Sequence, residues 1–166
     1  MKGQEFAWFI GKILDNNDTE NLNRVKVLPY GYYNDTVTAE QLPWSTVMMP
    51  NTLASSEGIG GNHQLDIGSW VVGFFRDAPA CQDAIVMGSI ATSTNGNPDI
   101  PSGADVHNKI YTTKAGHTLH VNNEGGQEFI EIKHGKHPQT CSIRMTPNGN
   151  IEIKGGVVSI NGSPQT

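Results

Sequence analysis

Residues 116–162 decide the fold and read GHTLHVNNEGGQEFIEIKHGKHPQTCSIRMTPNGNIEIKGGVVSING. Five short runs in this stretch alternate apolar and polar residues with a period of two, and clusters of Asn, Gly and Pro separate them. Such alternation is typical of β-strands that bury one face and expose the other to water. The side chains predicted to point inward are Leu119, Val121, Ile130, Ile132, Ile143, Met145, Ile151, Ile153, Val158 and Ile160.

These five strands are too few to close a core of their own, because each supplies only two inward apolar residues. An open sheet of this width also leaves one face and both edges uncovered. Two interpretations of the pattern remain open. Either copies of the segment from several chains stack into a solenoid-like prism, or the segment is a small meander that packs on the N-terminal half of the chain.

The N-terminal half contains five more runs typical of strands, at residues 6–14, 24–28, 44–49, 70–76 and 84–90. Between the second and third runs, Thr38 and Gln41 have the spacing of a capping box at the start of a short helix. Five strands with one early helix predict a small closed barrel of the OB type. Residues 92–110 are rich in Pro, Gly, Ser, Thr and Asn and predict a linker. The expected domains are therefore a barrel at 1–91 and a strand-rich segment at 111–166.

The composition supports an all-β protein and excludes some functions. Only 16% of the 166 residues are charged, 19 residues are Gly, and the formal net charge is -5. This acidic balance argues against nucleic-acid binding, which needs a basic patch. No apolar run approaches the length of a membrane-spanning helix, and the first residues lack a signal-peptide core, so synthesis in a cytoplasm is expected. Cys81 and Cys141 are expected to be reduced thiols.

The sequence offers no convincing catalytic, cofactor or metal site. The stretch GIGG at 58–61 lacks the Lys-Ser/Thr of a phosphate-binding loop. Histidines three residues apart on a strand point to opposite faces and cannot chelate a metal together. His117 shares the inward parity of Leu119, which leaves open a metal held by several copies on a symmetry axis. No pair of acids suggests glycosidase chemistry. We therefore expect a protein that is not an enzyme.

Three motifs, in this order, resemble one known family. They are LPW at 42–44, the Gly-rich GIGG, and GHTLHVNNEGG at 116–126. The chain resembles the central spike, or cell-puncturing hub, of contractile-tailed phages, and it is also similar to the spikes of type VI secretion systems. The resemblance implies an OB-fold hub followed by a trimeric, intertwined β-helix, or β-prism, whose core would be the ten inward residues.

The same resemblance implies the partners and the location. It implies a homotrimer in the baseplate of a virion, bound to tail tube and hub proteins, that pierces the host outer membrane when the tail contracts. A PAAR-type tip protein is expected at the end of the prism. The best-known member carries a lysozyme domain between barrel and prism, and only the linker stands there in this chain, so lysozyme activity is not implied. Some short spikes end in a His-based iron tip, and the terminal residues 161–166 contain no His.

A different class of function remains as an alternative. Trp44, Trp70 and the tyrosines at positions 30, 32 and 33 are residue types that stack on sugars. They would suit a carbohydrate-binding adhesion module of a virion or cell surface. Burial separates the two hypotheses, because these rings should be packed in a spike hub and exposed in a lectin.

Overall fold

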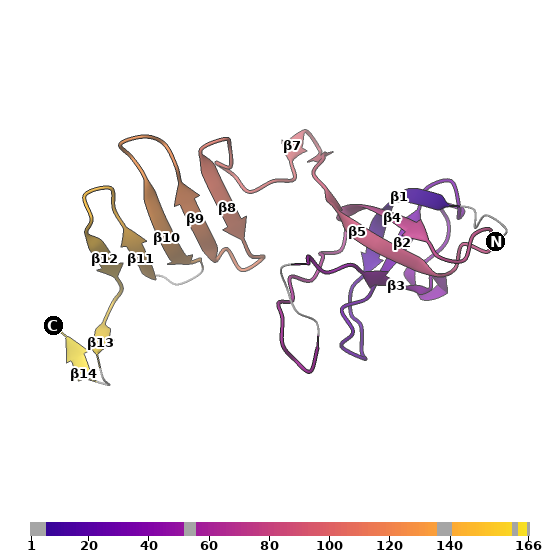
Figure 1. The fold of residues 1–166 in the computed structure, drawn as a ribbon, viewed down its shortest axis with the longest axis horizontal. Helices are drawn as coiled ribbons and strands as arrows, with labels where there is room; N and C mark the ends of the chain where they lie inside the picture. Colours follow the sequence, from indigo (N-terminus) through magenta and orange to yellow (C-terminus); the bar gives the residue numbers. More distant parts are fainter. Residues whose placement is uncertain (1–5, 52–55, 136–140, 161–162, 166) are drawn as a thin grey trace. The chain divides into compact units, whose positions relative to one another are not determined.

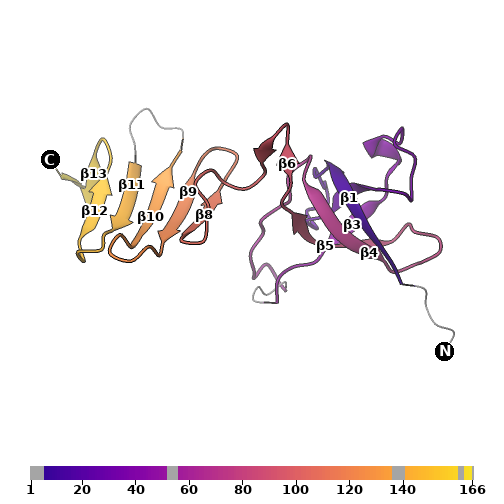
Figure 2. The ribbon, with the colours of Figure 1, turned by 90° about the horizontal axis from the view of Figure 1, so that it is seen from above.

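The computed structural model describes residues 6–51, 56–135, 141–160 and 163–165, with side chains described up to residue 159. The chain divides into two compact units, Met1–Thr92 and Ser93–Thr166. Both units are built from β-strands, drawn as arrows in Figure 1 and Figure 2. In the described part of the chain, no helix has the length and apolar character needed to span a bilayer.

The first unit is a closed barrel of five strands in the order β1-β2-β3-β5-β4. All contacts between neighbouring strands are antiparallel except for β3 and β5, which pair in parallel. The expected five-stranded barrel of the OB type is confirmed. The strands are β1 Ala7–Asp15, β2 Val25–Pro29, β3 Trp44–Val47, β4 Trp70–Phe75 and β5 Ala84–Ile90.

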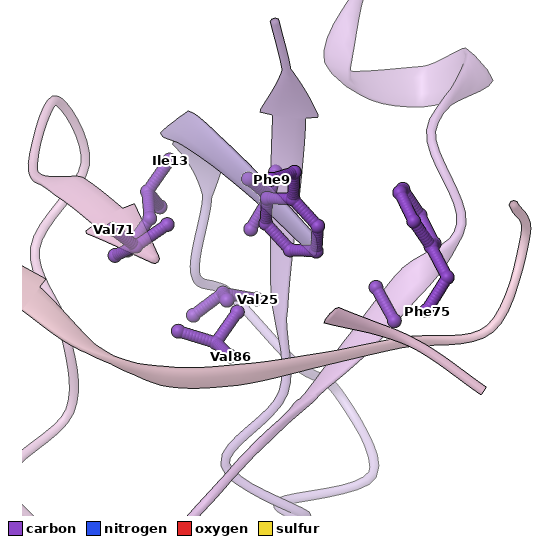
Figure 3. Close-up of a cluster of buried hydrophobic side chains, with 8 residues drawn as sticks. Phe9, Ile13, Val25, Val71, Phe75 and Val86 are labelled. Carbon is purple, nitrogen blue, oxygen red and sulfur yellow. The ribbon is translucent and has the colours of Figure 1, made fainter. Parts of the chain in front are cut away.

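The barrel is filled by side chains that alternate along its strands. Phe9 and Phe75 pack with ring centroids 4.9 Å apart, and Figure 3 shows both beside the aliphatic residues of the same cluster. Burying such side chains stabilises a fold by roughly 1.5–3 kcal/mol each. The buried cluster comprises Phe9, Ile13, Val25, Val27, Val71, Phe75, Ala84 and Val86.

Gly73 is required because the barrel is tight at this point. A Cβ atom on Gly73 would collide with the Ile85 carbonyl oxygen and with the Phe9 ring. The pairing of β4 with β5 also shifts register between Val72 and Gly73. Such a bulge bends a strand and increases its twist, which a small barrel needs in order to close.

Side-chain hydrogen bonds stabilise two of the segments that connect the barrel strands. The short 3-10 helix η1, Ala39–Gln41, begins with the predicted capping arrangement, in which the Thr38 N–H donates to the Gln41 Oε1 at 3.0 Å. In the loop between β1 and β2, the Arg24 guanidinium donates to both Asp18 carboxylate oxygens, at 2.7 and 3.0 Å. The hydrogen bonds from Arg24 hold the pKa of Asp18 well below its usual range. Asp18 therefore remains ionised and fixes the loop.

The second unit contains an antiparallel sheet of five consecutive strands in the order β12-β11-β10-β9-β8. Each strand of this sheet pairs with the strand next to it in the sequence. Two short hairpins accompany the sheet, β6 Ser93–Thr94 with β7 Asn97–Pro98 and β13 Val158–Ile160 with β14 Ser163–Gln165. The strands of the sheet are β8 Asn108–Thr112, β9 Thr118–Asn122, β10 Phe129–His134, β11 Cys141–Met145 and β12 Ile151–Lys154.

The sheet differs from the sequence prediction at both ends. Its first strand is β8, which begins inside the predicted linker 92–110, and the same stretch carries the β6–β7 hairpin. The predicted fifth strand, β13, instead pairs with β14. The physical reason is that strand pairing depends on a second segment as well as on the strand's own residues. β8 has little apolar alternation but matches β9 residue for residue, whereas Gly155-Gly156 separates β13 from β12.

Candidate functional site

The candidate site is the apolar face of the C-terminal sheet, which we call the apolar sheet face. Cross-strand register aligns its side chains in two rows, because directly paired residues point to the same side of a sheet. One row joins Val121, Ile130, Met145 and Ile151. The other row joins Leu119, Ile132, Ile143 and Ile153. Eight of the ten predicted inward residues therefore share one face.

This face is open to water in the single chain. Ile132 is 59% exposed and Ile151 is 66% exposed, although side chains of this kind are among those most often found buried. Seven of the eight are large apolar side chains with 43% or more of their surface exposed, namely Leu119, Ile130, Ile132, Ile143, Met145, Ile151 and Ile153. A contiguous apolar surface of this kind marks a site of association.

The opposite face of the sheet has its own polar and aromatic contacts. The Arg144 guanidinium lies 3.9 Å from the centre of the Phe129 ring, and the His120 ring packs edge-on against Phe129 at 4.7 Å. The His120 Nε2 lies 2.7 Å from the Asn108 Oδ1. This face therefore carries polar and charged side chains, and the Arg144 Nε is buried there without a hydrogen-bond partner among the described residues.

The two remaining predicted core residues lie outside the sheet. Val158 is partly buried in the β13–β14 hairpin. Ile160 ends β13, and its side chain lies outside the part of the chain that the structure describes. The assignment of these two residues to the same core as the other eight stays a prediction.

Sequence reasoning missed the first strand and the residues that it adds to the apolar sheet face. Tyr111 pairs with Leu119 and extends one row, while Lys109 pairs with Val121 and extends the other. The Lys109 Nζ donates to the Val106 carbonyl at 2.8 Å, so its charge turns back to the preceding loop. The sequence pattern that could have predicted β8 is weak, because the run NKIYT contains only two apolar residues of five.

His117, just before β9, and His134, at the end of β10, form a close pair. The His117 and His134 ring centroids lie 4.3 Å apart, and the Gly135 N–H donates to the His117 Nδ1 at 3.2 Å. Within the described residues, no cluster of three His, Cys, Asp or Glu side chains is placed to hold a metal ion.

The pKa shifts of Asp77, Asp105 and Cys81 arise from hydrogen bonds and burial within the folded chain. Backbone N–H groups of Asp83 and Gln82 lower the pKa of Asp77. The N–H of Asn108 and its side chain lower the pKa of Asp105. A general acid in glycosidase chemistry needs the opposite, a raised carboxyl pKa. Burial raises the pKa of the Cys81 thiol, whereas a nucleophilic cysteine needs a lowered one.

The aromatic residues behind the carbohydrate alternative have partners over their rings. Tyr30 and Trp70 stack on each other at 5.0 Å with an interplanar angle of 18°. The Trp44 ring lies under two cations, with the Lys26 Nζ at 5.0 Å and the Arg24 guanidinium at 5.6 Å from its centre. Tyr30 and Tyr32 are 40% and 41% exposed. The stacking surfaces that a sugar would use are therefore partly occupied.

The barrel, the sheet and the sequence motifs have counterparts in known proteins. The model of the Gp5 N-terminal OB domain family matches residues 31–155, which is more than half of the chain. The chain belongs to this family. The match begins after β2 and ends just after β12, so the family pattern covers part of the barrel and the whole five-stranded sheet.

Two curated relatives carry the same designation. The chain is 30% identical over 136 residues to the pre-baseplate central spike protein Gp5 of Enterobacteria phage T4. It is 36% identical over 109 residues to protein Gp5 of Vibrio phage KVP40. These alignments cover 76% and 60% of this chain but 24% of each relative. The chain thus spans about a quarter of the length of the curated relatives that it matches.

One solved structure is similar in fold. A chain of the Francisella PdpA–VgrG complex superposes with a TM-score of 0.52 at 8% sequence identity. The superposition covers 93% of this chain and 26% of that chain. At this identity the similarity establishes the fold, which extends over both units.

Proposed function

We propose that this protein is a structural central spike in the baseplate of a contractile-tailed phage, and that it works as a homotrimer. The observation that carries the proposal is the apolar sheet face, which the single chain leaves uncovered. Family membership and the name of the phage T4 relative support the same function.

The trimer would form when three apolar sheet faces pack against each other around an axis. Each sheet then forms one side of a three-sided prism, with the polar face outward. Five strands at about 4.8 Å spacing make a prism roughly 25 Å tall. The intertwined β-helix predicted from the sequence would bring the three copies of this segment together along their apolar sheet faces. The sheets would join by their side chains.

The mechanism of such a spike is mechanical. A prism with a dry core resists axial load because sliding one sheet would expose apolar surface to water. Driven by tail contraction, it would pierce the host outer membrane. The barrel would form the hub that joins the tail tube and baseplate proteins to the spike. The protein would be made in the host cytoplasm and act in the virion.

The blunt end of the prism is where we place a second protein. The β13–β14 hairpin follows the sheet, and its three-residue strands are too short to cover a three-sided end. A PAAR-type tip protein would seat on this end. The proposed spike uses no catalytic residue, cofactor or resident metal, and it binds no nucleic acid.

Sedimentation equilibrium of the purified chain at micromolar concentration tests the proposal. The expected result is the mass of three chains, with no folded monomer. A stable monomer would refute the trimer and leave the apolar sheet face without a function.

A further inference from the structure

The two margins of the C-terminal sheet carry opposite charges. Consecutive antiparallel strands place their connecting turns alternately at the two margins, as Figure 1 shows. One of them, which we call the basic margin, comprises the described residues at 112–118, 133–135, 141–142 and 154–155. It holds Lys114, Lys133 and Lys154, and these described positions include no Asp or Glu.

The other margin, which we call the acidic margin, comprises the described residues at 105–108, 122–129 and 146–150. It holds Asp105, Glu124 and Glu128, and these described positions include no Lys or Arg, with His107 as their one titratable base. Backbone N–H groups of its own turn lower the pKa of Glu128, so this carboxylate stays ionised at neutral pH. Lys109 follows this margin along β8 and donates its Nζ to a loop carbonyl at 2.8 Å.

The opposite charges of the two margins cannot meet within one sheet. Strand β10 begins directly after Glu128 and ends at His134. At about 3.4 Å per residue, the two margins lie roughly 20 Å apart, well beyond the screening length of about 8 Å at physiological ionic strength. The Lys154 Nζ lies 3.4 Å from the Glu152 Oε2, but Glu152 belongs to the middle of β12 and not to the acidic margin. Contact between the margins therefore requires a second chain.

The basic margin also carries the histidine pair on the side of the apolar sheet face. Extending the register of β9 with β10 by one position pairs His117 with His134, in line with Leu119 and Ile132. The Gly135 N–H donates to the His117 Nδ1 at 3.2 Å, so the neutral His117 ring carries its proton on Nε2. This Nε2–H is a hydrogen-bond donor suited to a carboxylate of a neighbouring chain.

Three-fold symmetry brings unlike margins together. In a cyclic trimer, each contact is heterologous, so the basic margin of one sheet meets the acidic margin of the next. Symmetry also places the same strand of each chain at the same level along the axis. The end of β10, with Lys133 and His134, thus lies opposite Glu128 at the start of β10 in the next chain. The neighbouring strand β9 adds His117 at one margin and Glu124 at the other, so a shift by one strand keeps opposite charges in contact.

We infer that the basic margin of each chain docks on the acidic margin of the next chain, and that this contact sets the direction and register of the three sheets. The inference rests on the trimer of the proposed function. Burial of the apolar sheet face favours association but specifies register weakly, because the hydrophobic effect is non-directional. A chain inserted upside down would exchange its two margins and bring like charges together, which opposes association. The charged margins therefore select three parallel chains.

A carbodiimide, which joins a carboxylate to an amine in direct contact, tests the inference on the purified full chain. The expected products link Glu124 or Glu128 to Lys114 or Lys133, identified by mass spectrometry of the crosslinked sample. Because these groups lie at opposite margins, roughly 20 Å apart in one chain, each such product joins two chains. A sample that sediments as a trimer without giving these products would overturn the inference and leave the spike proposal standing. A sample that sediments as a monomer would overturn the proposed trimer itself.

Charge reversal tests the effect of the contact on assembly. Glu128→Lys and Lys133→Glu, each alone, should slow trimer formation after dilution from denaturant by at least about tenfold, because each brings like charges together. The two changes combined should restore a rate within about threefold of the native rate, since opposite charges again face each other. Asp35→Lys makes the same change of charge at an exposed position of the barrel and should assemble like the native chain. Native rates for both single variants, or a combined variant no faster than they are, would contradict the margin contact.

Discussion

Replacing Ile132 by Asp is the sharpest test of the apolar sheet face. Ile132 lies at the centre of the middle strand, and register places Leu119 and Ile143 on either side of it. In the proposed trimer, three copies of this side chain lie close to one axis. Ile132→Asp would therefore place three carboxylates in a small apolar volume.

The magnitude follows from exposure and charge. Full burial of an isoleucine is worth about 1.5–3 kcal/mol. Because 59% of Ile132 is still exposed in the single chain, its packing in a trimer would contribute about 1–2 kcal/mol per copy. Burying an unpaired carboxylate costs several kcal/mol more, so three copies lose roughly 15 kcal/mol in all. Holding a trimer together at micromolar concentration requires roughly 16 kcal/mol over two association steps.

Ile132→Asp should therefore abolish the trimer at micromolar concentration, as measured by sedimentation velocity. Glu131→Ala is the control, because Glu131 is the adjacent residue and pairs with Arg144 on the opposite face. This control should sediment as a trimer with native thermal stability. If Ile132→Asp and Glu131→Ala behave alike, the assignment of the inward and outward faces is wrong.

Three other predictions concern the barrel and the activity. Asp18→Asn should destabilise the barrel at neutral pH; because the folded-state pKa of Asp18 is lowered by Arg24, its stabilising effect is present above about pH 4 and is lost as the pH falls below that. Thermal melts between pH 7 and 2 should show this loss in the native chain and a weaker one in the variant. Gly73→Ala should destabilise the barrel by about 1–3 kcal/mol through overpacking, and an unchanged denaturant midpoint would contradict the tight contact with Phe9. The purified chain should not clear a peptidoglycan suspension, and clearing that one carboxylate substitution abolishes would disprove this.

Period-two alternation encoded much of the local structure. The runs in both halves became strands near the predicted positions, because a strand places neighbouring side chains on opposite sides whatever its partners are. The parity of Ile130 and Ile132 followed from the same rule, and so did the assignment of Glu131 to the other face. The capping box at Thr38 was also readable, because its hydrogen bond joins residues three apart in the sequence.

Only the tertiary structure decided which strands pair and what remains uncovered. The polar residues of β8 do not predict a strand, and its place in the sheet comes from its pairing with β9. β13 pairs with β14 instead of with a strand of the five-stranded sheet. The exposure of Phe6 and Trp8 was also not readable, because an apolar run such as FAWFI does not reveal which of its side chains the folded chain covers. Alternation is a property of one segment and is written in its residues. Pairing and coverage depend also on a second segment or surface, so the residues of one segment do not determine them.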